Sequence, residues 1–186
     1  MRVLIASLLL LACRLAVADY QTVLTAYAIQ DTLSTSQSGG VHRHLQSNPG
    51  LGLGLALDGG GSERLSLDYT DFDLGNNDSL QLLNLNLDHF FPVPGLPPAA
   101  RVFLGGTVGI GRLDLSGEAG GGTATGPSVG VRLGGAWQLN PQLSLELGAR
   151  YLHTGLKAQL RGAAGTADFT VDADTGVWLG LSWHLN

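Results

Sequence analysis

Apolar and polar residues alternate along much of the chain, and the pattern is clearest between Ser128 and His153. The segments on either side of Leu139–Gln142 each place an apolar side chain at every second position. A period of two predicts two β-strands joined by a tight Asn-Pro turn. The positions between the apolar residues hold small or charged side chains. This is typical of a narrow barrel whose apolar face meets lipid and whose other face lines the lumen.

The same alternation predicts six further strands. They are expected at about residues 20–29, 50–58, 63–72, 80–91, 101–115 and 176–185. Eight strands predict an all-β fold, an eight-stranded antiparallel up-and-down transmembrane β-barrel. In the strand at 101–115 the apolar residues change parity at Gly111–Arg112, where we expect a β-bulge.

The connections alternate in length. The polar stretch Gln30–Asn48 is expected to be a long loop, as are Gly117–Gly126 and a segment from about Gly155 to Ala167. The connections at Gly59–Ser62 and after Leu139 are tight. Short turns of such barrels face the periplasm and long loops face outward, so both termini are expected in the periplasm.

Seven aromatic residues are expected to form two girdles at the lipid–water boundaries. The periplasmic girdle comprises Tyr20, Phe91, Trp137 and Trp183, and the outer girdle comprises Tyr69, Phe72 and Tyr151.

The first 18 residues read as a secretory signal peptide, with a basic start, an apolar core too short to span a bilayer, and an Ala16-Val17-Ala18 cleavage site. The barrel domain is then 19–186. Leu10–Cys13 resembles a lipoprotein cleavage box and is a competing interpretation. Cleavage after Ala18 removes Cys13, the only cysteine, so neither a disulfide nor a thiolate metal site is expected.

Composition narrows the class of protein. After the signal no run of 18 apolar residues occurs, so a helical membrane protein is excluded. The 28 glycines show no collagen-like period, so a collagen-like protein is excluded as well. Cleavage removes two of the ten basic residues and leaves eight against 15 acidic ones, a net charge of about −7. Such a charge argues against nucleic acid as a partner.

Seven charged or titratable residues share the parity of the small residues and should point into the lumen. They are Arg64, Asp68, Asp88, Arg132, Glu146, Arg150 and His184. Eight strands enclose a lumen just wide enough for side chains to fill, and buried charges must pair. We therefore expect an ion-pair network that plugs the lumen, with a gate across a narrow pore as the alternative.

Two polar clusters could bind metal but are better explained as solvated surface. His42-Arg43-His44 lies in a Gly/Ser-rich loop. Asp168, Asp172 and Asp174 lack the glycine and final glutamate of an EF-hand loop. We expect no metal and no cofactor.

The hairpin AWQLNPQLSLELGARYL resembles the penultimate hairpin of small OmpA-like and OmpX-like outer-membrane barrels, in which a Leu-Ser-Leu strand leads to Gly-x-Arg-Tyr. The resemblance implies a porin-like, eight-stranded barrel of the Gram-negative cell envelope that the outer-membrane assembly machinery inserts. The chain ends directly after the last expected strand, which predicts that the peptidoglycan-binding domain of full-length OmpA is absent.

Residues 148–157 also resemble the active-site strand of PagL-like lipid A deacylases, which carry a histidine, a serine two residues later and a downstream glutamate. Here Gly155 stands two residues after His153, and no glutamate follows Glu146. Without a nucleophile beside the base, acyl transfer has no machinery, and we expect no enzyme.

We therefore expect a non-enzymatic outer-membrane barrel that presents surface loops and supports envelope integrity or surface interaction. Its expected partners are outer-membrane lipid and lipopolysaccharide, the assembly machinery, and an unknown surface ligand, and the protein is expected to be a monomer. A narrow channel is the alternative function.

Overall fold

The computed structural model of the protein describes residues 20–37, 41–60, 62–75, 78–115, 122–162 and 165–185, with side chains for all but 37, 41–46, 160–162 and 165–167. These ranges contain nine β-strands. The strands are β1 (Gln21–Gln37), β2 (Val41–Gln46), β3 (Gly50–Asp58), β4 (Glu63–Gly75), β5 (Asp78–Pro92), β6 (Ala100–Leu115), β7 (Gly122–Asn140), β8 (Leu143–Gly162) and β9 (Gly165–Leu185). Among the described residues, no helix is long and apolar enough to cross a membrane.

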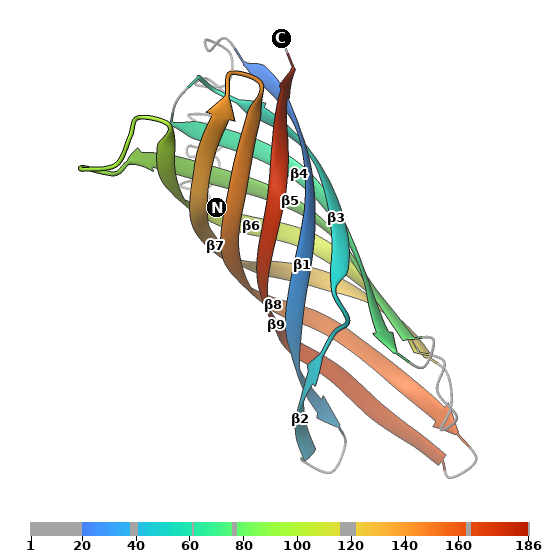
Figure 1. Cartoon of the computed structure of the whole chain (residues 1–186). Helices are drawn as coiled ribbons and strands as arrows, with labels where there is room; N and C mark the ends of the chain where they lie inside the picture. Colours follow the sequence, from blue (N-terminus) through green and yellow to red (C-terminus); the bar gives the residue numbers. More distant parts are fainter. Residues whose placement is uncertain are drawn as a thin grey trace, which may run out of the picture.

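Eight of the strands close into a ring (Figure 1). β1 pairs antiparallel with β3, each of β3 to β8 pairs antiparallel with the next strand along the chain, and β9 pairs with β1 over residues Thr22 to Gln37. This closure confirms the predicted eight-stranded up-and-down barrel. It also leaves the ring without free edges, because every strand has two neighbours.

The ninth strand, β2, lies outside the prediction. It pairs antiparallel with the far half of β1, from Thr32↔Gln46 to Gln37↔Val41. The stretch Gln30–Asn48 is therefore largely a β-hairpin and not the long loop expected from its polarity. β8 and β9 likewise continue to Gly162 and Gly165, so the expected loop from about Gly155 is mostly strand. These extensions reach well past the other strands at the end opposite the C-terminus (Figure 1).

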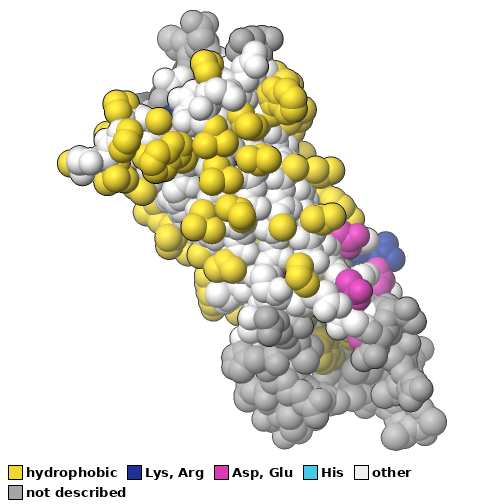
Figure 2. All heavy atoms as spheres, viewed as in Figure 1, with side chains coloured by type: hydrophobic (Ala, Val, Ile, Leu, Met, Phe, Trp, Pro, Cys, Tyr) yellow, Lys and Arg dark blue, Asp and Glu magenta, His cyan; other side chains and the backbone are white. Residues whose placement is uncertain are grey.

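The outer wall of the barrel carries an apolar band, and Figure 2 shows hydrophobic side chains spread over much of its visible face. Leu53, Val108, Leu133, Leu147 and Leu179 are all more than half exposed on this wall. On β3 the exposed leucines alternate with Gly52, Gly54 and Ala56 on the inner face. The surface is inside-out relative to a soluble barrel, as expected for a barrel in lipid.

The polarity of the two faces reverses towards the end that carries β2. On β6, Val108 and Ile110 are exposed on the outer wall, but the next outward side chain is Arg112, and the inward Leu113 is completely buried. The predicted bulge at Gly111–Arg112 is wrong, because the registers with β5 and β7 run unbroken through these residues. The apolar residues change parity because the surroundings of the strand change. Within the band the outer face of β6 meets lipid, whereas beyond it the inner face packs in an apolar core.

This inner apolar layer lies towards the end of the barrel that carries β2. It includes Leu33, Phe72, Leu80, Leu82, Leu113, Leu152, Leu156 and Val171. Phe72 is 1 % exposed and belongs to this layer, so its assignment to the outer girdle is wrong. It shares the inward parity of Asp68 and Thr70 on β4, and lipid cannot reach it.

Five of the other six predicted girdle residues are exposed on the outer wall. Tyr69 and Tyr151 are 43 % and 50 % exposed towards the far end, and Phe91, Trp137 and Trp183 are similarly exposed at the end that carries the C-terminus. Tyr20, directly before β1, is half-buried.

Candidate functional site: the charged lumen

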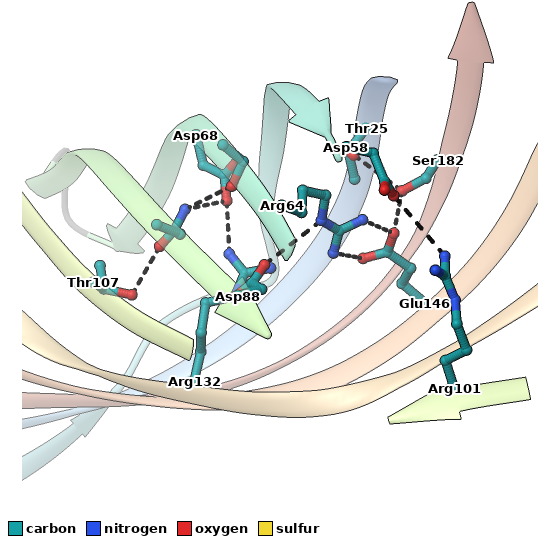
Figure 3. Close-up of polar contacts among 12 residues, drawn as sticks. Thr25, Asp58, Arg64, Asp68, Asp88, Arg101, Thr107, Arg132, Glu146 and Ser182 are labelled. Carbon is teal, nitrogen blue, oxygen red and sulfur yellow. Dashed lines mark hydrogen bonds and ion pairs between the residues drawn. The ribbon is translucent and has the colours of Figure 1, made fainter. Parts of the chain in front are cut away.

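The interior of the barrel holds a chain of ion pairs between strands on opposite walls (Figure 3). Arg64 of β4 forms a two-pronged pair with Glu146 of β8, at 2.5 Å from Nη1 to Oε1 and 2.9 Å from Nη2 to Oε2. Its Nε lies 3.6 Å from Asp88 Oδ2 on β5. Ser182 donates a hydrogen bond of 2.5 Å to Glu146. All these side chains are buried, so the pairs cross-link the wall inside a region of low dielectric.

Asp88 links this pair to a second arginine. Arg132 Nε of β7 lies 3.2 Å from Asp88 Oδ1, and its Nη1 donates to Asp68 Oδ2 at 3.0 Å. Asn86 donates to Asp68 and accepts from Thr107. Two arginines and three carboxylates from four strands, β4, β5, β7 and β8, therefore form one network.

Arg150 lies in a separate cluster towards the apolar layer. Its Nη2 donates to Asp31 at 2.5 Å and to Asp174 at 3.0 Å. The sequence missed Asp31, and the expectation that Asp174 belongs to a solvated rim is wrong, because its side chain is completely buried. Each aspartate keeps one buried oxygen without a hydrogen-bond partner among the described residues. One arginine thus serves two acids.

His184 also lies inside but makes no ion pair within the described set. Its Nε2 lies 3.0 Å from Ser144 Oγ, a hydrogen bond between β9 and β8. The structure therefore places all seven predicted lumen residues in the interior, divided among one network, one separate cluster and this pair.

Aromatic rings complete the network, and sequence reasoning did not select them. Arg64 lies over Phe90, and Arg132 lies over Trp178, with 4.8 and 4.9 Å from each guanidinium carbon to the ring centroid. Phe103 lies near both arginines. Parity was the available signal, because Phe90 shares the inward parity of Asp88, and Phe103 that of Gly105.

The space left among these side chains is small. A cavity of about 20 Å³ within the lumen is lined by residues that include Tyr27, Asp68, Asn86, Arg132 and Glu146. This volume holds about one water molecule.

Outside the apolar band, one ion pair lies on the outer wall. Arg112 Nε donates to Asp114 at 2.9 Å, and Thr123 donates to the same carboxylate. The hydrogen bonds from Arg112 and then Thr123 lower the pKa of Asp114. Both groups are solvent-exposed, so this pair marks a polar surface and contributes little to stability.

Other candidate chemistry finds little support. Among the described side chains, no group of three or more His, Cys, Asp or Glu residues could hold a metal ion. The side chains of His42, Arg43 and His44 lie outside the description. His153 points outward, and its cross-strand neighbours are Val129 and Ala173, neither of which can act as a nucleophile.

A closed ring of eight antiparallel strands with an apolar outer wall and a charged, filled lumen defines the transmembrane β-barrel class. Solved structures agree. Neisserial surface protein A matches with a TM-score of 0.64 at 15 % identity, over 87 % of this chain and 97 % of that one. The outer-membrane protein OprG of Pseudomonas aeruginosa matches at 0.58 and 15 %, over 91 % and 98 %. Ail, the attachment invasion locus protein of Yersinia pestis, matches at 0.53 and 9 %, over 89 % and 97 %.

The chain therefore has the fold of the small eight-stranded outer-membrane barrels, as its resemblance to OmpA-like and OmpX-like proteins implied. No family model matches the sequence, and no curated protein matches it.

Proposed function

We propose that the protein is a non-enzymatic outer-membrane barrel that holds surface hairpins on a closed, non-conducting scaffold. The observation that carries this proposal is that a lumen occupied by side chains is combined with long strand extensions at one end of the barrel. The barrel interior is occupied by cross-linked side chains, while β1–β2 and β8–β9 project past the apolar band.

The extensions are the part suited to contact a partner. Loops carry function on such scaffolds, while the barrel supplies position. Two structural neighbours bear names that refer to the surface or to attachment, Neisserial surface protein A and Ail of Yersinia pestis. In this proposal the tips of the extensions face the exterior, the termini face the periplasm, and lipopolysaccharide surrounds the polar wall near Arg112 and Asp114. The barrel works as a monomer, is inserted by the assembly machinery, and contributes to envelope integrity.

A narrow channel is the second candidate, and one observation favours it. Asp88 lies at ion-pair distance from both Arg64 and Arg132, yet both of its buried oxygens lack a hydrogen bond among the described residues. It could accept Arg64 more closely if Glu146 released that side chain, and such an exchange of partners is one way to open a plugged lumen.

Single-channel recording in planar bilayers distinguishes the two functions. We expect no conductance from the wild-type protein and none from Glu146→Ala, although this variant should lose about 3–5 kcal/mol of stability by leaving Arg64 with one partner fewer. Conductance in the wild type, or a rise in Glu146→Ala, would favour the channel. Cells that display the protein should bind a surface ligand less well when the β1–β2 hairpin is shortened, whereas a change at the tight turn near Gly60 should not alter binding.

A further inference from the structure

The connection between β5 and β6 differs from the other connections at its end of the barrel. β3 and β4 are joined through Gly59–Ser62 and β7 and β8 through Pro141–Gln142, both of them tight. Residues 93–99 instead form a longer turn that projects sideways from the rim, visible as the green loop at the left of Figure 1. A purely connecting segment does not need this length, because β5 and β6 pair in register up to Pro92↔Arg101.

This turn is uncharged and apolar. No charged residue occurs from Phe90 to Ala100, and Leu96 at its tip is 50 % exposed. The apolar surface continues from the turn into the wall through Phe91 and Trp137, which are 42 % and 49 % exposed. Figure 2 shows hydrophobic side chains on this projection and next to it on the wall, together with white backbone atoms. An exposed apolar patch that is continuous with the lipid-facing band indicates a membrane contact.

The backbone of the turn also has few N–H groups that need a hydrogen-bond partner. Four of the eight residues from Pro92 to Ala99 are prolines, which have no N–H to satisfy. Leu96 N–H donates to Val93 at 3.1 Å, Ala100 N–H donates to Pro97 at 2.9 Å, and the carbonyl of Ala99 accepts from Gln138 at 2.8 Å. Gly95, with φ of +87°, allows the sharp bend. Unsatisfied backbone groups are costly near hydrocarbon, and this turn has unusually few donors.

We propose that residues 92–99 form an interfacial foot, which lies against the phospholipids of the periplasmic leaflet with Leu96 among the upper acyl chains. The proposal rests on the proposed function, since it requires a barrel in a bilayer. Trp137 and Phe91 at the base of the foot belong to the aromatic girdle, and aromatic side chains prefer this depth. The foot therefore enlarges the surface by which the barrel contacts one leaflet, and it helps to fix the depth and tilt of the barrel in the bilayer.

Spin labels at single cysteines test the proposal in the full chain with Cys13→Ser, reconstituted in phospholipid vesicles. The labels are placed at Leu96→Cys and Pro94→Cys in the foot, at Leu147→Cys on the band, and at Ser62→Cys in the tight turn at the same end. Collisions with oxygen, which concentrates in the bilayer, are compared with collisions with a water-soluble nickel chelate. We expect the label at 96 to favour oxygen several-fold more than the label at 62, with the label at 94 between them.

The control at 147 separates the two proposals. If the label at 147 favours oxygen while those at 96 and 94 match the label at 62, the foot projects into water and the inference is wrong. If the label at 147 also favours nickel, the barrel is not embedded in the bilayer and the proposed function fails. If the labels at 96 and 147 both favour oxygen, the result supports both the foot and the proposed function.

Discussion

Inward-facing glycines leave the space that the larger lumen side chains occupy. A Cβ on Gly105 would lie 2.1 Å from Asp88 Oδ1 and 2.8 Å from the carbonyl oxygen of Leu87. A Cβ on Gly176 would lie 1.7 Å from Asp31 Oδ1, and one on Gly148 would lie 2.3 Å from the ring of Trp178. Real Cβ atoms do not approach other atoms this closely, so each of these glycines is required by the side chain opposite it.

Neighbouring glycines on β6 provide a matched test. Gly105→Ala should lower the unfolding free energy by about 1–3 kcal/mol, because Asp88 and its arginines must move. Gly106→Ala should leave stability unchanged or raise it by about 0.4–1 kcal/mol, because its Cβ has no atom within 4 Å and alanine restricts the unfolded chain. Urea unfolding in lipid vesicles measures both. Equal losses in the two variants would contradict the close packing at Asp88.

The shared arginine predicts an unequal response to mutation in the Arg150 cluster. Arg150→Gln leaves Asp31 and Asp174 buried without a cation and should cost about 3–5 kcal/mol. Asp174→Asn leaves one acid for one arginine and keeps a polar side chain in place, so we expect a loss of at most about 1 kcal/mol. The same unfolding measurement compares them. If Asp174→Asn loses as much as Arg150→Gln, both aspartates are needed as charged partners.

Parity found seven charged or titratable lumen residues, and it also shows why others were missed or misplaced. Arg64, Glu146 and Arg150 alternate with leucines or other apolar residues, so their direction could be read from the sequence. Phe72 was assigned by its aromatic type and its position near a strand end, although its parity pointed inward. Asp31 could not be found because the segment around it was expected to be a loop, where parity has no meaning.

At the scale of the strand, β6 shows that a single strand can cross from the apolar band into a polar region, with the polarity of its two faces reversed between them. Its outer face changes from Val108 and Ile110 to Arg112 and Asp114, while its inner face changes from Gly105 and Thr107 to Leu113. In the sequence this change is visible only as a shift of the apolar residues to the other parity, and a β-bulge would produce the same shift. The register with both neighbours is needed to choose between them.

Arginine substitutions along β8 test where the lipid band ends. Leu147 is 62 % exposed and lies midway between Leu143 and Tyr151, so Leu147→Arg should cost about 2–4 kcal/mol in a bilayer. Gln159 is exposed on the outer extension of the same strand, and Gln159→Arg should change stability by less than about 0.5 kcal/mol. Unfolding in vesicles gives both values. A similar penalty at both positions would mean that the band extends beyond Tyr151.

The polar composition of Gln30–Asn48 concealed its strands for a related reason. The β1–β2 hairpin belongs to the extension beyond the apolar band, where water replaces lipid on the outer face and the sequence needs no leucines there. The closed ring, its strand number and the apolar wall could be predicted because they depend on alternation within the band. The extensions could not, because serine, threonine and glutamine are equally common in loops.

For the whole molecule, the asymmetry between the two ends predicts a topology. An epitope inserted in the connection between β1 and β2 should be labelled on intact cells, since long strands project on that side. An epitope at Gly60, in the tight turn at the opposite end, should be labelled only after the outer membrane is opened. Antibody binding to intact and permeabilised cells measures this, and external labelling at Gly60 would reverse the orientation.

The apolar layer around Leu113 and Phe72 gives the projecting end its own supporting core. β8 continues for about 35 Å of strand between Tyr151 and Gly162, at the usual rise per residue. Buried leucines such as Leu113, Leu152 and Leu156 pack inside the barrel towards the base of this extension. Peptides grafted at its tip should therefore be displayed well beyond the apolar band, without altering the outer wall of that band.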